Sequence, residues 1–105
     1  MASTPNLTDR NDVTLWAANL LLEDLLSRAA DWTSRPEPER LDFFLEWEES
    51  MDRLTGAIID AEAGRLSVVQ QERLAALAAR LTAARTTIDH LGLDYPDLGR
   101  LSLAS

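Results

Sequence analysis

The sequence predicts an all-α protein: a three-helix bundle in which the second and third helices form a long antiparallel hairpin and the first packs along it. In two segments the apolar residues recur at alternating steps of three and four, which is typical of helices packed against neighbouring helices. Proline and glycine residues separate these segments at points where helices end. The chain has 105 residues, which suits one domain with a modest core.

The expected organisation is a single helical domain covering residues 1–105. Its segments are a loose N-terminus (1–8), a first helix (9–33), a second helix (38–63), a third helix (68–91) and a C-terminal tail (93–105). Thr8 is the expected cap of the first helix, with Asp9 and Asp12 near the positive end of its dipole. The main apolar stripe of this helix consists of Leu15, Ala18, Leu21, Leu22, Leu25, Leu26, Ala29 and Trp32.

The second helix has the most regular pattern in the chain. Its apolar stripe is Phe43, Phe44, Trp47, Met51, Leu54, Ile58 and Ala61. Pro38 suits the opening turn, where a missing N–H costs nothing, and Gly64 suits the residue after the end. Gly56 lies inside the helix and costs about 1 kcal/mol relative to alanine. Two interpretations of Gly56 are open: close approach by a neighbour, or no structural role.

The third helix has clear signals at both ends. Ser67 and Gln70 have the spacing of a capping box, and Gly92 closes the helix. Its apolar positions are Leu74, Leu77, Leu81, Ala84, Ile88 and Leu91. The short link 64–66 predicts a hairpin with the second helix, whose acidic side would face the flanking arginines Arg73, Arg80 and Arg85. The tail either lies back over the bundle or docks on a partner.

The composition excludes several classes of function. The net charge is −8, which disfavours nucleic acid and anionic membrane as main partners because both repel an acidic protein. The absence of cysteine excludes disulfides, thiolate chemistry and cysteine zinc sites, and no cofactor is expected. The N-terminus lacks a basic run followed by an apolar core, and no apolar run is long enough to span a membrane. The expected location is therefore the cytoplasm.

Two groups of apolar residues lie off the main stripes. Val13, Trp16 and Leu20 share a second face of the first helix, and Leu41, Leu45 and Ile59 form a smaller patch on the second. A helix at the edge of a small bundle cannot bury two separate faces in its own core. Because exposed aromatic and aliphatic patches usually mark contact surfaces, these six residues are the predicted interface. A homodimer is favoured, and a basic protein is a further possible partner.

An acidic group on the second helix is the candidate metal site. Glu46, Glu49 and Asp52 place carboxylates on adjoining turns, an arrangement that can hold Mg²⁺. All-helical nucleotide pyrophosphohydrolases resemble this in part, since they hold Mg²⁺ between an ExxE pair on one helix and an ExxD pair on the next. Here the next helix offers only Glu72 and Asp89, so the second half of that motif is missing. No metal site is therefore predicted, and a solvated acidic face is the favoured interpretation.

The remaining residues that could take part in catalysis form no recognisable catalytic motif. His90 is the only histidine, and no serine has the sequence context of a nucleophile elbow. The sequence therefore favours a non-enzymatic interaction module: a small acidic adaptor, regulator or neutralising partner that docks through a helix face. The alternative is a Mg²⁺-dependent hydrolase of a nucleotide-type phosphate. An enzyme would bring its carboxylates together in a pocket, whereas a docking face can leave them spread over an open surface.

Overall fold

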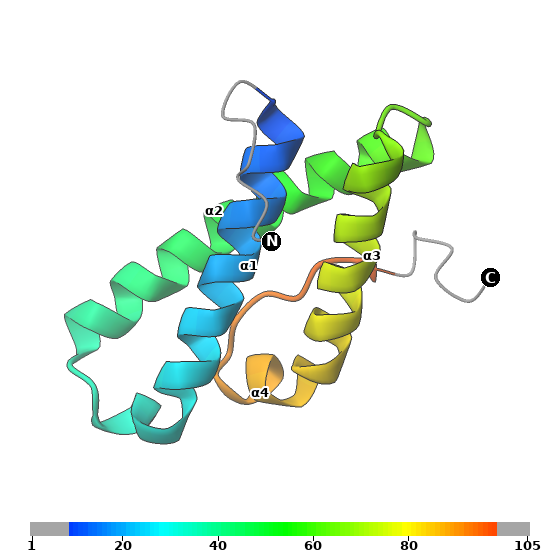
Figure 1. The fold of residues 1–105 in the computed structure, drawn as a ribbon. Helices are drawn as coiled ribbons and strands as arrows, with labels where there is room; N and C mark the ends of the chain where they lie inside the picture. Colours follow the sequence, from blue (N-terminus) through cyan, green and yellow to red (C-terminus); the bar gives the residue numbers. More distant parts are fainter. Residues whose placement is uncertain (1–8, 99–105) are drawn as a thin grey trace.

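The computed structural model describes residues 9–98, and these are helical with no strand among them. The helices are α1 (Arg10–Arg28), a 3-10 segment η1 (Ala29–Ser34), α2 (Glu37–Glu62), α3 (Val68–Ala83) and α4 (Arg85–His90). Figure 1 shows α1 and α3 running in the same direction. The helix between them in the sequence, α2, runs in the opposite direction. The all-α fold class is thus confirmed.

The helix ends follow local chemistry. Asp9 caps α1 by accepting hydrogen bonds from the backbone N–H groups of Asn11 and Asp12 at 2.9 and 3.3 Å. This cap corrects the expected start by one residue, while Thr8 lies outside the described residues. At α3 the capping box between Ser67 and Gln70 is confirmed, with both reciprocal hydrogen bonds present.

Both predicted glycine stops are present. Gly64 and Gly92 each have a φ of 73°, in the left-handed region that favours glycine. The N–H of Gly64 bonds the carbonyl of Ala61, and the next N–H, from Arg65, bonds the carbonyl of Asp60. Gly92 and the residue after it repeat this pattern at the end of α4. Each glycine therefore ends its helix while satisfying carbonyl groups of the last turn.

The first helix ends earlier than expected. Beyond Arg28 the chain tightens into η1, where Asp31 has non-helical angles (φ −122°, ψ 22°). Ser34 donates its hydroxyl to the carbonyl of Asp31 at 2.8 Å, which stabilises the turn. The tighter winding places Trp32 edge-on against Phe43, with ring centroids 5.6 Å apart. Trp32, the last residue of the stripe predicted for the first helix, is buried at this end of the core.

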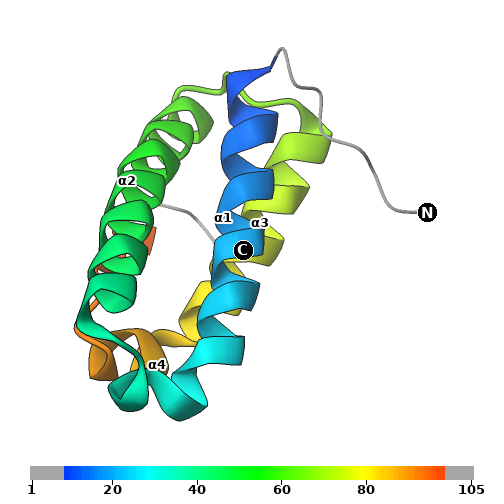
Figure 2. The same ribbon diagram turned by 90° about the vertical axis from the view of Figure 1, so that its left-hand side faces the viewer.

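The third predicted helix is two helices. α3 ends at Ala83, and the chain turns at Ala84 (φ −93°, ψ 1°) into the short α4. Thr82 donates its hydroxyl to the carbonyl of Ala78 at 2.8 Å, a contact that bends helices. Figure 2 shows α4 turned out of line with α3, at the end of the bundle where η1 lies. Ile88 is buried there, so the bend lets α4 close the core.

The core joins all helices into one cluster. The predicted stripes supply it, with Leu22, Trp47, Leu54, Leu77 and Leu81 fully buried. The main exception is Leu26, which is exposed although it was placed on the stripe of the first helix. The segment after α4 adds Leu93 and Leu98, which are also buried. Of the two alternatives for the tail, packing over the bundle is observed for residues 93–98, while the rest of the tail lies outside the described residues.

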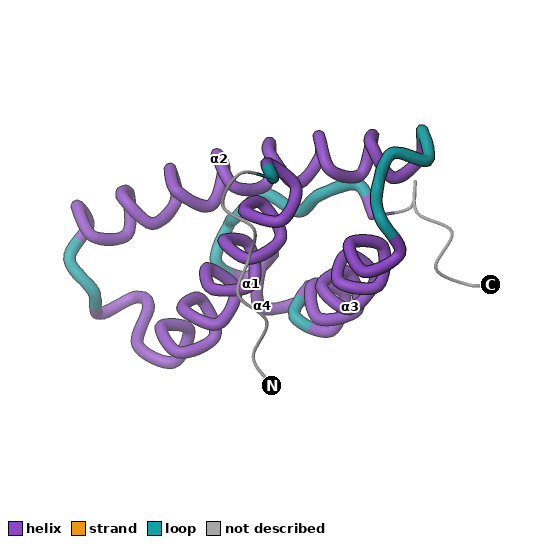
Figure 3. The backbone as a smooth tube through the Cα atoms, turned by 45° about the horizontal axis from the view of Figure 1, so that its top comes forward, coloured by secondary structure: helices purple, strands orange, loops and turns teal. Residues whose placement is uncertain are grey.

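The close hairpin of the second and third helices is not confirmed. Of the long helices, α1 is the one that packs closely against both others, whereas α2 and α3 diverge along their lengths. Figure 3 shows the segment that follows α4 passing between α2 and α3. The apolar residues of this segment occupy the space in which a hairpin would place direct contact between the two helices.

Polar contacts fix the position of α1. Gln70 donates a hydrogen bond to Asp12 at 3.0 Å, and Arg80 donates one to Asn19 at 2.7 Å. Side-chain hydrogen bonds therefore join α1 to α3 at two positions along their length. The expectation that Arg73, Arg80 and Arg85 face α2 is wrong. Arg73 and Arg80 lie near acidic residues of α1, because α1 is the helix beside α3, and Arg85 pairs with Asp89 within α4.

Candidate interaction groove between α1 and α2

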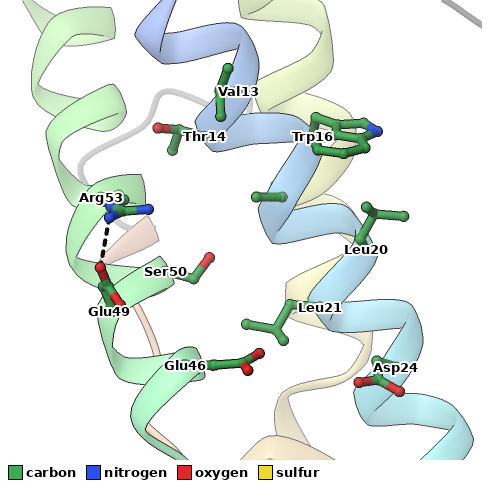
Figure 4. Close-up of a pocket in the computed structure, with 11 residues that line it drawn as sticks. Val13, Thr14, Trp16, Leu20, Leu21, Asp24, Glu46, Glu49, Ser50 and Arg53 are labelled. Carbon is green, nitrogen blue, oxygen red and sulfur yellow. Dashed lines mark hydrogen bonds and ion pairs between the residues drawn. The ribbon is translucent and has the colours of Figure 1, made fainter. Parts of the chain in front are cut away.

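A groove of about 450 Å³ lies between α1 and α2 on the outside of the bundle. The α1 side is mostly apolar, with Val13, Trp16, Leu20 and Leu21 beside the polar Thr14 and Asp24, whereas the α2 side carries Glu46, Glu49, Ser50 and Arg53. Figure 4 shows Leu21 and Glu46 extending into the space between the helices, while Trp16 and Leu20 extend from the side of α1 that faces away from α2. The groove thus has one mostly apolar wall and one charged wall.

Val13, Trp16 and Leu20 in this wall are the second face of α1 that the sequence predicts, whereas Leu21 belongs to the predicted main stripe and packs against the core. The three residues of the second face lie roughly opposite Leu15, Ala18 and Leu22, which enter the core. Trp16 and Leu20 are each 47% exposed, and no described segment covers them. Within residues 9–98 the tail does not cover Trp16, because it packs near Trp47 and Thr82 instead.

The three predicted interface residues of α2 do not lie together. Ile59 lines a second groove section of about 370 Å³, together with Arg10, Thr14, Arg53, Gly56 and Asp60. Because Thr14 and Arg53 line both sections, the two form one continuous path along α1 and α2. Leu41 and Leu45 are exposed but line neither section. The structure therefore brings together the α1 residues and Ile59, and leaves Leu41 and Leu45 outside both sections, nearer the start of α2.

Gly56 opens the wall of the second section. A methyl group at this position would meet no heavy atom within 4 Å beyond its own helix backbone, and its φ is ordinary for a helix. Close approach by another element within residues 9–98 therefore does not explain this glycine. Its absent side chain instead leaves open space in the groove.

Asp60 anchors the far end of the groove. This aspartate is buried, with 8% of its surface exposed. Arg10 and Asn11 of α1 both donate to its Oδ2 at 3.0 Å, and Arg65 donates to its Oδ1 at 3.1 and 2.9 Å. The hydrogen bonds from Asn11 and Arg65 hold the pKa of Asp60 below its ordinary value of 3.8. This cluster fixes the start of α1 against the end of α2.

The sequence pattern does not single out Asp60, and its role was not predicted. A signal was present. An acidic residue in the last turn of a helix faces the negative end of the dipole, which is unfavourable unless basic partners compensate. Arg65, five residues on and just beyond the helix, supplies one such partner.

The acidic candidates Glu46, Glu49 and Asp52 do not converge. Glu46 and Glu49 line the groove and Asp52 does not. Glu49 forms an ion pair with Arg53 at 2.6 Å within α2. Within residues 9–98, no group of three or more histidine and acidic side chains is close enough to hold a metal ion. His90 is exposed at the end of α4.

Comparisons with protein-family models, with curated proteins and with solved structures find no match to this chain. In the part of the chain that the structure describes, no helix has the length and apolar character needed to cross a membrane. The functional argument therefore rests on the groove and its residues.

Proposed function

We propose that this protein is a non-enzymatic interaction module, a small acidic adaptor, regulator or neutralising partner, which binds a helical segment of another protein in the α1–α2 groove. The observation that carries the proposal is the half-exposed pair Trp16 and Leu20, which line a groove of about 450 Å³. Tryptophan is among the residues most enriched at binding hot spots, and an apolar groove between helices suits an amphipathic helix.

Charge supports a basic partner. The chain has a net charge of −8, and Asp24, Glu46 and Glu49 lie along one end of the groove. Complementary charge raises association rates and disfavours acidic partners. The carboxylates remain spread along an open surface, which supports docking over metal-dependent hydrolysis.

We also propose that the separate stripe of Leu41 and Leu45 mediates a homodimer. Both side chains are exposed on α2 and line neither groove section. Exposed aliphatic residues at helical spacing are what a symmetric helix–helix contact between two copies requires. In this arrangement one face of α2 joins two copies and the groove remains open for the partner.

The test of the partner site is site-specific photo-cross-linking in the cells that make the protein. A photoreactive residue at Leu20 should capture a second polypeptide, whereas one at Val69, which is also exposed but lies on α3, should not. Equal capture from both positions would contradict a specific groove.

Substitutions then separate the two surfaces. Trp16→Glu should abolish the cross-link from position 20 and keep the dimer, whereas Leu45→Glu should give a monomer that still cross-links. Both variants should keep wild-type helicity and change the free energy of unfolding by less than about 0.5 kcal/mol, because both side chains are exposed. Unfolding of Trp16→Glu would show that Trp16 belongs to the core.

A further inference from the structure

Resting on the proposed function, we infer that the partner segment is an amphipathic helix of about four turns that lies parallel to α2 and places a lysine or arginine against Glu46. This inference adds the partner's length, its direction and one specific charge contact. Each follows from a different feature of the groove.

The length follows from the extent of the two groove sections. On α1 they run from Arg10 to Asp24, and on α2 from Glu46 to Asp60. Each stretch is about 14 residue steps, or about 21 Å at 1.5 Å per residue. A partner helix of about four turns spans that distance and presents two or three apolar side chains to Val13, Leu20 and Leu21.

The direction follows from the charges at the two ends. Glu46 lines the first section and has no partner among the described residues, whereas the far end of the second section has two arginines, Arg10 and Arg65, against the single carboxylate of Asp60. Arg53 lines both sections and pairs with Glu49, so it favours neither end. Asp60 is already compensated by its bonds to Arg10 and Arg65. The groove is therefore acidic at one end and basic at the other. A helix has a positive N-terminus and a negative C-terminus, so its N-terminus belongs at the Glu46 end.

The charge contact follows from the pairing of the groove carboxylates. Asp24 is held by Arg28 at 3.0 Å and Glu49 by Arg53 at 2.6 Å. Glu46 has no ion-pair or hydrogen-bond partner within residues 9–98, and Figure 4 shows it extending from α2 toward α1. It is the groove carboxylate that is open to a cation from outside. A basic residue in the N-terminal half of the partner reaches it.

Gly56 supports the same placement. It lies in the wall of the second section, where a methyl group would meet no other atom within 4 Å. The partner backbone can therefore approach α2 closely near its own C-terminal half.

The probes are two synthetic peptides of about 14 residues each, capped at both ends, with leucines at helical spacing on one face. The first carries a lysine in its second turn and the second carries a glutamate there. Binding is measured by fluorescence anisotropy with wild-type protein, Glu46→Lys and the control Glu72→Lys. Glu72 is exposed on α3, so its replacement makes the same change in net charge away from the groove.

We expect the lysine peptide to bind wild type, and Glu46→Lys to lower its affinity about tenfold, because attraction becomes repulsion. The glutamate peptide should bind Glu46→Lys more tightly than it binds wild type. Glu72→Lys should change either affinity less than about twofold. Equal losses of affinity in Glu46→Lys and Glu72→Lys would show that the net charge of the protein alone determines binding, and would overturn the contact at Glu46.

The direction is read from a nitroxide label at the N-terminus of the lysine peptide. Amide signals of α2 near Glu46 should broaden more strongly than those near Gly56. The reverse pattern would overturn the parallel placement. Failure of both peptides to bind wild type would overturn the helical partner, whereas the proposed function is judged separately by the cross-link from position 20. A cross-link there to a second copy of this chain would also overturn the inference.

Discussion

The indole Nε1 of Trp47 donates a hydrogen bond to the backbone carbonyl oxygen of Asp94 at 2.6 Å. This bond joins the middle of α2 to the segment after α4, 47 residues later in the chain. On the other side of that segment, Tyr95 lies beneath the guanidinium of Arg85 at 4.6 Å from the ring centroid. The segment is therefore held from both α2 and α4, and it completes the core between α2 and α3.

The first prediction tests this bond with a matched pair of substitutions. Trp47→Phe removes the donor and leaves the carbonyl of Asp94 without this bond. Trp32→Phe removes a similar volume at an indole that makes no hydrogen bond to residues 9–98. Trp47 is 0% exposed and Trp32 is 8% exposed. We expect Trp47→Phe to cost about 1 kcal/mol more in urea-induced unfolding than Trp32→Phe. Equal losses would mean that the bond adds nothing to stability.

A second prediction concerns the core of α3. Leu81 is fully buried at the centre of the apolar stripe that the sequence predicts. Leu81→Ala should lower the free energy of unfolding by about 2–5 kcal/mol, because it removes packing and leaves a cavity. Leu26→Ala is the control, since Leu26 is exposed on α1, and it should change stability by less than about 0.5 kcal/mol. A loss below about 1 kcal/mol at position 81 would contradict its burial.

Helical periodicity predicts the core because burial follows the spacing of apolar residues. It finds Phe43, Leu54 and Leu77 in their observed places, and the same logic finds the exposed face of Trp16 and Leu20. Periodicity does not reveal the bend at Ala84, because the apolar spacing continues through it. The predicted partners of Arg73 and Arg80 are wrong for a related reason. They depend on which helix lies beside α3, and this is set by the tail filling the space next to α2.

The third prediction compares two glycines. Gly56 has ordinary helical angles and open space around it, so Gly56→Ala should raise the free energy of unfolding by about 0.5–1 kcal/mol. Gly64 has a φ of 73°, which L-residues with a side chain rarely adopt. Gly64→Ala should therefore lower stability by about 1 kcal/mol. Thermal unfolding of both variants measures the contrast.

Gly56→Ala also bears on the groove. If Gly56 is kept for close approach by a partner helix, the stabilised variant should bind the lysine peptide more weakly than wild type does. A variant that is both more stable and equally able to bind would show that this glycine has no role in docking.

The last prediction concerns acid sensitivity. The pKa of Asp60 is held below 3.8 by hydrogen bonds from Asn11 and Arg65, and the pKa of Asp9 is lowered by its cap bond to the N–H of Asp12. A carboxyl group with a lower pKa in the folded state than in the unfolded state stabilises the fold when it is ionised. This stabilisation is complete above the unfolded pKa and is lost as the pH falls through the folded pKa.

The free energy of unfolding should therefore fall as the pH is lowered from about 5 to about 2, and Asp60→Asn should flatten that fall. The same variant should be less stable than wild type at neutral pH, because an amide pairs less strongly with Arg10 and Arg65. Asp52→Asn is the control on the same helix: Asp52 is exposed and has no ion pair among the described residues, so its curve should run parallel to that of wild type. If Asp60→Asn and Asp52→Asn give the same pH dependence, the cluster at Asp60 does not join α1 to α2 in the way its geometry indicates. If Asp60→Asn alone flattens the curve, protonation of this one carboxyl group loosens the end of the groove where Arg10 meets α2.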